Sequence, residues 1–385
     1  MPIPSQRHLF DLPRDICYLN AAFMTPFPKD FAAVGERALA MNMHPWEVGA
    51  ADFFTGSERV RALAARLFDA EASAIALVPA VSYAVAIAAR NLPLSRGRII
   101  LTLAEEFPSN YYGWQRMAED HGARVELLEG PPERDWTAAV LEAIEHHGPR
   151  IALVAVPHVH WSSGVMLDLA AIRTATRAIG AALFLDLTQS LGALPVSMRT
   201  LDPDYAVAAG YKWLFGPYAL GYLYVAERRR HGRPLEENWI ARAGSEDFSR
   251  LVDYSHAYQP GARRFDMGER SNFLLMPFAE AALTRVLDWG VDDIAESLAA
   301  LNGRLIAEME DAGFIATPAG RRSPHLVAAR HPDVNSRAIA AHWHRAGIRI
   351  SVRGKWIRIA PHLWVDRRDE SRFSRAVKDV RAAAG

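Results

Sequence analysis

Lysine is rare in this 385-residue chain, which limits the places where a primary amine could do chemistry. The four lysines are Lys29, Lys212, Lys355 and Lys378, whereas the other 40 basic residues are arginine. Lys29 follows a proline in a Pro-rich turn, and Lys378 lies in a charged C-terminal stretch typical of a solvated helix. Only Lys212 is embedded in an aromatic, apolar segment, Gly-Tyr-Lys-Trp-Leu-Phe-Gly-Pro at 210–217. Lys212 is therefore the candidate for chemistry that needs an amine, such as Schiff-base formation.

A carboxylate ends the apolar run that precedes this lysine segment. Asp186 follows Ala-Ala-Leu-Phe-Leu at 181–185, a run typical of a buried strand, and would emerge at the ligand-binding edge of a parallel sheet. Taken alone, Asp186 is better interpreted as a turn-capping residue. Its spacing from Lys212 favours a joint role, because an electron-sink cofactor needs both a lysine and an acid that keeps its pyridine nitrogen protonated.

The same chemistry requires groups that hold a phosphate and a substrate carboxylate. Val81 and Ser82 begin a predicted helix, whose free N–H groups and dipole favour an anion. A plain N-cap role for Ser82 stays open.

Two segments resemble the class V aminotransferase superfamily of fold type I, which contains cysteine desulfurases, selenocysteine lyases, isopenicillin N epimerases and kynureninases. They are Asp-Leu-Thr-Gln-Ser-Leu-Gly at 186–192 and Lys-Trp-Leu-Phe-Gly-Pro at 212–217. The resemblance implies an α/β fold: a large domain with a mainly parallel, seven-stranded-type sheet and a small C-terminal α+β domain. It also implies pyridoxal 5'-phosphate as the cofactor and an amino acid as the substrate.

The resemblance gives each candidate residue a role. Asp186 would pair with the pyridinium nitrogen, Gln189 would bond the ring hydroxyl, and Lys212 would form the Schiff base. Ser271 and Asn272 align with a stretch that reaches the partner subunit's phosphate, which implies a homodimer with shared active sites. The predicted cofactor-binding set is Val81, Ser82, Phe107, Trp161, Asp186, Gln189, Tyr211, Lys212, Ser271 and Asn272.

Several positions depart from the desulfurase pattern. Phe107 stands where desulfurases place a histidine over the ring; its face can stack there, but it cannot move a proton. His160 and Trp161 occupy the loop where desulfurases keep an asparagine. Tyr211 precedes the lysine, as in kynureninases, and would reach the phosphate; a core tyrosine is the alternative. The substrate contacts are expected to be His160 and Arg358, whose guanidinium fork matches a carboxylate.

The predicted reaction is cleavage at the β-carbon of an L-amino acid, by a C–S lyase or a kynureninase-like enzyme. Residues 351–356 hold no cysteine, although desulfurases need a thiol shortly before the carboxylate arginine. Transamination and epimerisation use the same residues and stay open. A remote alternative from another class is a metal-dependent hydrolase built on His158 and His160. No metal site is predicted, because these two histidines have no further ligand pattern.

The elements expected to position these residues form two units. From about 75 to 225, short apolar strands alternate with helical stretches, which predicts a mainly parallel sheet covered on both faces. Residues 227–263 are polar and irregular, and a compact α+β pattern follows, ending in a helix near 369–384. The predicted domains are 1–260, an N-terminal arm with the cofactor-binding domain, and 261–385.

Composition excludes several classes of partner. Acidic and basic residues balance at 44 each, which argues against a nucleic-acid or anionic-membrane surface. No apolar leader or membrane-spanning run is evident, so the cytoplasm is the expected location. Cys17 is the only cysteine and lies in a short apolar stretch, which indicates a buried structural thiol.

Overall fold

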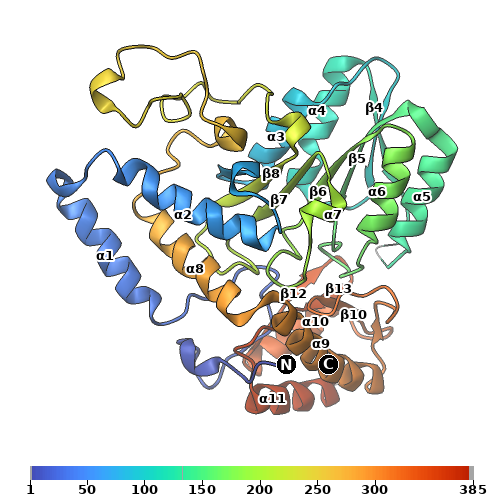
Figure 1. The fold of residues 1–385 in the computed structure, drawn as a ribbon. Helices are drawn as coiled ribbons and strands as arrows, with labels where there is room; N and C mark the ends of the chain where they lie inside the picture. The colour runs from blue at the N-terminus through green and yellow to red at the C-terminus, as the bar shows by residue number, and fades with distance from the viewer. Residues whose placement is uncertain (1, 132, 381–385) are drawn as a thin grey trace.

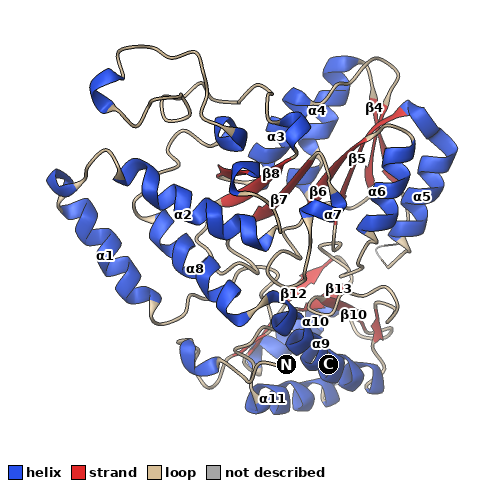
Figure 2. Cartoon of the chain, in the orientation of Figure 1, coloured by secondary structure: helices blue, strands red, loops and turns tan. Residues whose placement is uncertain are grey.

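A seven-stranded sheet forms the centre of the computed structural model, which describes residues 2–131 and 133–380 (Figures 1 and 2). Six strands run parallel, and β8 is antiparallel to both of its neighbours. The mainly parallel sheet expected from the sequence is confirmed. The strands, in spatial order, are β2 (Ile75–Val78), β8 (Gly221–Val225), β7 (Tyr205–Ala209), β6 (Ala182–Asp186), β5 (Ile151–Pro157), β3 (Ile99–Leu103) and β4 (Arg124–Leu128).

Helices cover both faces of this sheet, because successive residues of each buried strand point to opposite sides. Ile75 and Leu77 of β2 belong to one apolar core, whereas Ala76 and Val78 belong to another. Helices α3 (Val81–Asn91) and α4 (Tyr112–His121) contribute to the second core. The helices of the first core include α2 (Asp52–Leu67), α5 (Trp136–His147), α6 (Leu169–Ala178) and α8 (Leu275–Trp289).

A smaller unit follows α8 and lies below the large sheet in Figure 1. Its antiparallel sheet has the order β12 (Ser351–Arg353), β13 (Trp356–Ile359), β10 (Val327–Arg330) and β9 (Ile315–Ala316). Its helices are α9 (Val291–Asp311), α10 (Ser336–Arg345) and α11 (Arg367–Lys378). Helix α11 corresponds to the helix expected near 369–384, of which 381–384 lie outside the described residues.

The N-terminal arm joins this smaller unit. Strand β1 (Cys17–Tyr18) pairs in parallel with β11 (Ile348–Arg349). Cys17 is fully buried there, as expected, and burial raises the pKa of its thiol. Helix α1 (Phe31–Met43) then packs on α8. The division between domains at residue 260 stays a prediction.

A buried ion pair anchors the segment between β8 and α8, which otherwise contains only short 3-10 turns among its described elements. Arg61 of α2 donates to both carboxylate oxygens of Asp266, at 3.0 and 2.7 Å, and both side chains are fully buried. Asp266 also accepts the N–H of Leu77 in β2, at 2.8 Å. This pair fixes residues 266–272 beside the edge of the large sheet.

No helix within residues 2–131 and 133–380 is long and apolar enough to cross a membrane.

Candidate active site

A cavity of about 210 Å³ opens at the carboxyl edge of the large sheet. The ends of β6 and β7 and the loops after β2, β3 and β5 meet at this edge, together with the start of the antiparallel β8. This is where open α/β sheets bind ligands. Its lining includes Val81, Glu106, Phe107, Trp161, Asp186, Thr188, Gln189, Tyr211, Lys212 and Tyr218.

Lys212 presents a free amine to this cavity. Its Nζ lies 5.6 Å from the ring centre of Phe107 and 5.7 Å from that of Tyr211. The side chain is buried, and no described residue hydrogen-bonds Nζ. Burial lowers the pKa of Lys212 to about 8; Asp186 opposes this shift, and the positive charge of Arg358 adds to it. About a tenth of the amine is therefore uncharged at pH 7, far more than for an ordinary lysine.

Asp186 lies at the end of β6, on the same cavity wall. Its Oδ1 accepts the N–H of Thr188 at 2.9 Å. Burial raises the pKa of Asp186, while the hydrogen bonds from Thr188 and the charge of Lys212 oppose the shift. A buried carboxylate held this way is suited to pair with a cationic group entering the cavity.

The lysine segment is fixed by two close contacts. Thr25 of the N-terminal arm donates its hydroxyl to the carbonyl of Lys212, at 2.8 Å. Gly192 has φ +89°, and a Cβ at this position would lie 2.7 Å from the carbonyl oxygen of Trp213. A side chain there would force apart the two segments that carry Asp186 and Lys212.

Gln189 is more constrained than the sequence suggested. Its Oε1 accepts the indole N–H of Trp213 at 2.9 Å, and its Nε2 donates to the carbonyl of Ala22 at 3.1 Å. One amide hydrogen and one lone pair remain for a ligand. The predicted bond from Gln189 to a ring hydroxyl stays a prediction.

The N-terminus of α3 supplies a place for an anion. Ala80 is the N-cap, and no side chain caps the helix, so N–H groups of the first turn are left without side-chain acceptors. Val81 lines the cavity, whereas Ser82 is exposed in the first turn. The alternative of Ser82 as a plain N-cap is wrong, because the N-cap is Ala80 and Ser82 is the second residue of the helix.

Aromatic side chains form the outer wall. Phe107 and Trp161 meet edge to face, with ring centres 5.5 Å apart and planes at 76°. The indole N–H of Trp161 donates to the carbonyl of Glu105 at 2.7 Å, which fixes its orientation. Tyr211 lines the cavity, with its ring centre 4.6 Å from that of Tyr218, and its half-buried side chain also packs against an apolar core of the sheet.

His160 lies behind this wall, not in it. It is fully buried, its Nδ1 lies within hydrogen-bond distance of the hydroxyls of Ser162 and Ser163, and its ring stacks on Trp136. Burial lowers the pKa of both His160 and His158 to about 4. The predicted substrate contact of His160 therefore has no access to the cavity in this arrangement. No group of three or more His, Cys, Asp or Glu side chains that could hold a metal gathers among the described residues.

Arg358 reaches the site from the C-terminal sheet. It is buried on β13, donates to the carbonyl of Trp161 at 2.8 Å and to the hydroxyl of Ser351 at 3.1 Å. Burial and the nearby charge of Arg353 lower its pKa to about 9. Arg358 does not itself line the cavity, but it touches a residue that does.

Ser271 and Asn272 lie outside the cavity of this single chain. The hydroxyl of Ser271 donates to the carbonyl of Phe53. Asn272 Oδ1 accepts the N–H groups of Leu274 and Leu275, at 3.2 and 2.9 Å, at the start of α8. Their predicted contact with a partner subunit stays a prediction.

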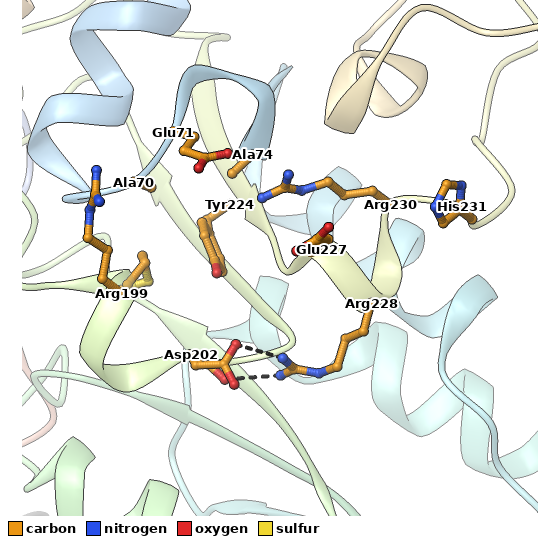
Figure 3. Close-up of a pocket in the computed structure, with 11 residues that line it drawn as sticks. Ala70, Glu71, Ala74, Arg199, Asp202, Tyr224, Glu227, Arg228, Arg230 and His231 are labelled. Carbon is orange, nitrogen blue, oxygen red and sulfur yellow. Dashed lines mark hydrogen bonds and ion pairs between the residues drawn. The ribbon is translucent and has the colours of Figure 1, made fainter.

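A larger cavity of about 660 Å³ lies near the opposite edge of the sheet (Figure 3). Two arginines that line it are paired with carboxylates, and the first of them, Arg228, pairs with Asp202 at 2.6 Å and with Asp204 at 3.0 Å. Arg199 pairs with Asp69. No lysine lines this cavity, so the cavity with Lys212 is the better candidate site.

Comparison with known proteins shows the family to which the chain belongs. Residues 36–376 match the family model described as aminotransferase class-V. The chain belongs to this family. It is a pyridoxal-phosphate-dependent enzyme. It is 30% identical over 323 residues to a kynureninase of Deinococcus radiodurans, covering 80% of this chain and 75% of that protein. An uncharacterized aminotransferase of Bacillus subtilis is 27% identical, covering 78% and 77%.

Solved structures share the class-V fold. The apo cysteine desulfurase of Thermococcus onnurineus superposes with a TM-score of 0.83 at 18% identity, covering 98% of this chain and 99% of that one. The cystine C–S lyase C-DES, in complex with cysteine persulfide, gives a TM-score of 0.83 at 19% identity, covering 94% and 97%. At these identities the likeness concerns the fold, and it confirms the fold-type-I architecture expected from the sequence.

The donors in the cavity of this class-V chain fit pyridoxal phosphate. A free amine, a buried carboxylate, an uncapped helix N-terminus and a flat aromatic side chain face one space. These are the groups that an aldehyde, a pyridine nitrogen, a phosphate and a planar ring require.

Glu106 is a site residue that the sequence did not reveal. It lines the cavity, accepts the N–H of Phe107 at 2.6 Å and the amide of Asn110 at 3.3 Å. Burial and the charge of Asp186 raise its pKa to about 8. A glutamate just after a strand is usually a surface residue, so no signal in the sequence singled it out.

The lowered pKa of Lys212 predicts unusual reactivity. In the cofactor-free protein at pH 8, about half of this amine is uncharged, against well under one in a hundred for an ordinary lysine. Acetic anhydride at pH 8, followed by peptide mass spectrometry, should therefore acylate Lys212 at least as fast as the more exposed Lys355. In Asp186→Asn the opposing charge is lost, so the pKa of Lys212 should fall further. If the acylation rate of Lys212 instead rose with pH to a midpoint near 10.5, the effect of burial on its pKa would be contradicted.

Proposed function

We propose that this chain is a lyase that cleaves at the β-carbon of an L-amino acid, with Lys212 as the residue that attaches the cofactor. The observation that carries the proposal is the unbonded amine of Lys212, held beside Asp186 among aromatic rings. Among the four lysines, Lys212 alone lines this cavity.

Each residue around the cavity has a proposed role in binding the cofactor. Bound pyridoxal phosphate supplies an electron sink for the charge left when a bond at the α-carbon breaks. Asp186 would hold the ring nitrogen protonated, Phe107 would cover the ring, and the N-terminus of α3 would bind the phosphate. Gln189 would hydrogen-bond the ring hydroxyl with its remaining amide hydrogen. Tyr211 would contact the phosphate from the wall opposite Phe107.

The substrate needs two further groups. Arg358 would bind and orient the α-carboxylate, because its buried guanidinium has no carboxylate partner among the described residues. Lys212, once released from the cofactor, would take the proton from the α-carbon, a task suited to an amine whose pKa is near 8. Loss of the β-substituent would then follow.

Cleavage at the β-carbon is favoured by the wall of the cavity and by the relatives. Phe107 and Trp161 provide an apolar surface for a β-substituent. Seven of the relatives compared are named kynureninase, which supports a carbon–carbon bond as one target. Because the chain shares its fold with a cystine C–S lyase, a carbon–sulfur bond is a second candidate for the bond that is cleaved. Transamination or epimerisation is the second candidate, since one relative carries the name aminotransferase.

We further propose a two-fold dimer in which Ser271 and Asn272 complete the partner subunit's phosphate site. The surface supports an assembly, because Leu39, Met43 and Trp46 are exposed by 55, 63 and 76% on α1 and the turn that follows it. Neighbouring exposed apolar side chains of this kind mark protein interfaces.

The identity of the cofactor lysine can be tested directly. Borohydride reduction of the purified enzyme should fix the pyridoxyl group on the peptide that contains residue 212. Lys212→Ala should fold, show no such label and lose nearly all turnover, since its amine is gone. Lys355→Ala serves as the matched control and should behave as the wild type. Label on Lys29 or Lys355 instead would contradict the proposal.

The reaction type can be tested with kynurenine and S-substituted cysteines, each with and without an added keto acid. A lyase should release alanine from kynurenine, or pyruvate and ammonia from the cysteines, without the keto acid. Arg358→Met should raise KM at least tenfold, because the clamp on the carboxylate is lost. Turnover that depends on the keto acid and leaves the carbon skeleton whole would identify an aminotransferase.

The assembly can be tested by light scattering at assay concentration. The mass should be twice 42.7 kDa. Mixing Lys212→Ala with an Asn272→Ala variant should restore activity in the heterodimer, since one of its two sites then carries neither change. A fully active monomer would exclude shared sites.

A further inference from the structure

The hairpin of β12 and β13 carries two arginines on one face. Ser351 pairs with Arg358 and Arg353 pairs with Trp356 across the two strands. Directly opposed residues of an antiparallel pair lie on the same face of the sheet, and so do alternate residues of one strand. Arg353 and Arg358 therefore lie on one face, as diagonal neighbours. One of these arginines is assigned above to the α-carboxylate; the other has no assigned role.

Both guanidinium groups lie against Trp161, the aromatic wall of the cavity. The guanidinium carbon of Arg353 is 5.6 Å from the indole centre, and that of Arg358 is 6.0 Å away. Arg358 also donates to the carbonyl of Trp161. The two positive charges therefore flank a side chain that lines the site.

Neither charge is neutralised by a carboxylate in the part of the chain that the structure describes. Arg353 donates only to the carbonyl of Val352, at 2.8 Å, and Arg358 only to a carbonyl and a hydroxyl. The Nε of Arg358 is buried without a hydrogen-bond partner. Burial lowers the pKa of both groups, and each lowers the pKa of Lys212.

Two like charges held together at partial burial are unfavourable unless anions join them. One α-carboxylate can satisfy Arg358 but leaves Arg353 without an anion. Many other arginines in the described part of the chain are paired with carboxylates; Arg228, for example, binds two aspartates. The hairpin is thus arranged for two negative charges.

We infer that Arg353 is a specificity-determining residue that binds a second acidic group of the substrate, at the far end of its side chain. The inference rests on the proposed function, in which Arg358 takes the α-carboxylate. Diagonal neighbours across antiparallel strands are about 7–8 Å apart, a separation that two carboxylates joined by a short carbon chain can span. The substrate class is an amino acid with an acidic side chain, whose carbon chain would contact Trp161.

The test measures binding to the cofactor-loaded enzyme by calorimetry, with acids of matched length. Succinate is compared with butyrate and glutarate with valerate, in the wild type, Arg353→Met, Arg358→Met and Lys355→Met. In Arg353→Met, the methionine side chain keeps an apolar chain against Trp161. Lys355→Met is the control, because it removes a positive charge from the same turn, and Lys355 lies over Trp356 instead of Trp161. Retention of bound cofactor and an unchanged near-ultraviolet circular dichroism spectrum show that each variant is folded. If Arg353→Met is not folded, Arg353→Lys takes its place in the comparison.

The wild type should bind each dicarboxylate at least about tenfold more tightly than its monocarboxylate partner. Arg353→Met should abolish this ratio with little change in monocarboxylate affinity, while Lys355→Met should keep it; Arg353→Lys should retain part of it. An unchanged ratio in Arg353→Met would overturn the inference and leave Arg353 as a cation stacked on Trp161. Unchanged monocarboxylate binding in Arg358→Met would instead contradict the proposed function.

Discussion

Desolvation of one amine governs the site. Lys212 loses water when its segment packs into the carboxyl edge of the sheet, and the uncharged form of its amine is favoured as a result. Asp186 limits this effect, because its own burial is tolerated only beside a cation or a donor. The aromatic wall of Phe107 and Trp161 keeps water away from both groups. The other contacts described around the cavity enclose or orient Lys212 and Asp186.

Sheet order explains how residues far apart in the sequence meet. Strands β6 and β7 are neighbours, so the loop after Asp186 and the loop that carries Lys212 leave the same edge side by side. Gly192 allows these loops to touch, and Thr25 fastens the second of them to the N-terminal arm. Antiparallel β8 returns the chain past the same edge. The position of the cavity thus follows from the order of the strands.

The sequence predicted the alternating strands and helices from residue 75 onward, because their apolar periods and caps are local properties. Asp168, for example, is a typical helix-capping residue, and its side chain caps α6 by accepting the N–H of Ala171. Helices α1 and α2 were not predicted; each contains a glycine, Gly35 and Gly56, which weakens the helical signal. The pattern of residues 348–352 is that of one short strand, but in the structure it divides between two sheets at Ile350.

The sequence motifs predicted several residues that the fold brings to one cavity, but they did not predict the contacts that those residues make with the rest of the structure. Asp186, Phe107, Tyr211 and Lys212 line one cavity, since the motif fixes their strand ends. His160 is buried away from that cavity against Trp136 of α5, which lies far from the motif in the sequence. The involvement of Glu106 likewise arises from tertiary packing. Periodicity and spacing carry no information about such contacts.

The pairing of β1 with β11 has a consequence for biosynthesis. Cys17 is made some 330 residues before Ile348, its partner, and at 5–20 residues per second that gap is about 15 to 65 s. During that time the arm that will hold Lys212 through Thr25 has no strand to pair with. The contact of Thr25 with the lysine segment therefore belongs to an arm whose own strand partner is among the last parts of the chain to be synthesised.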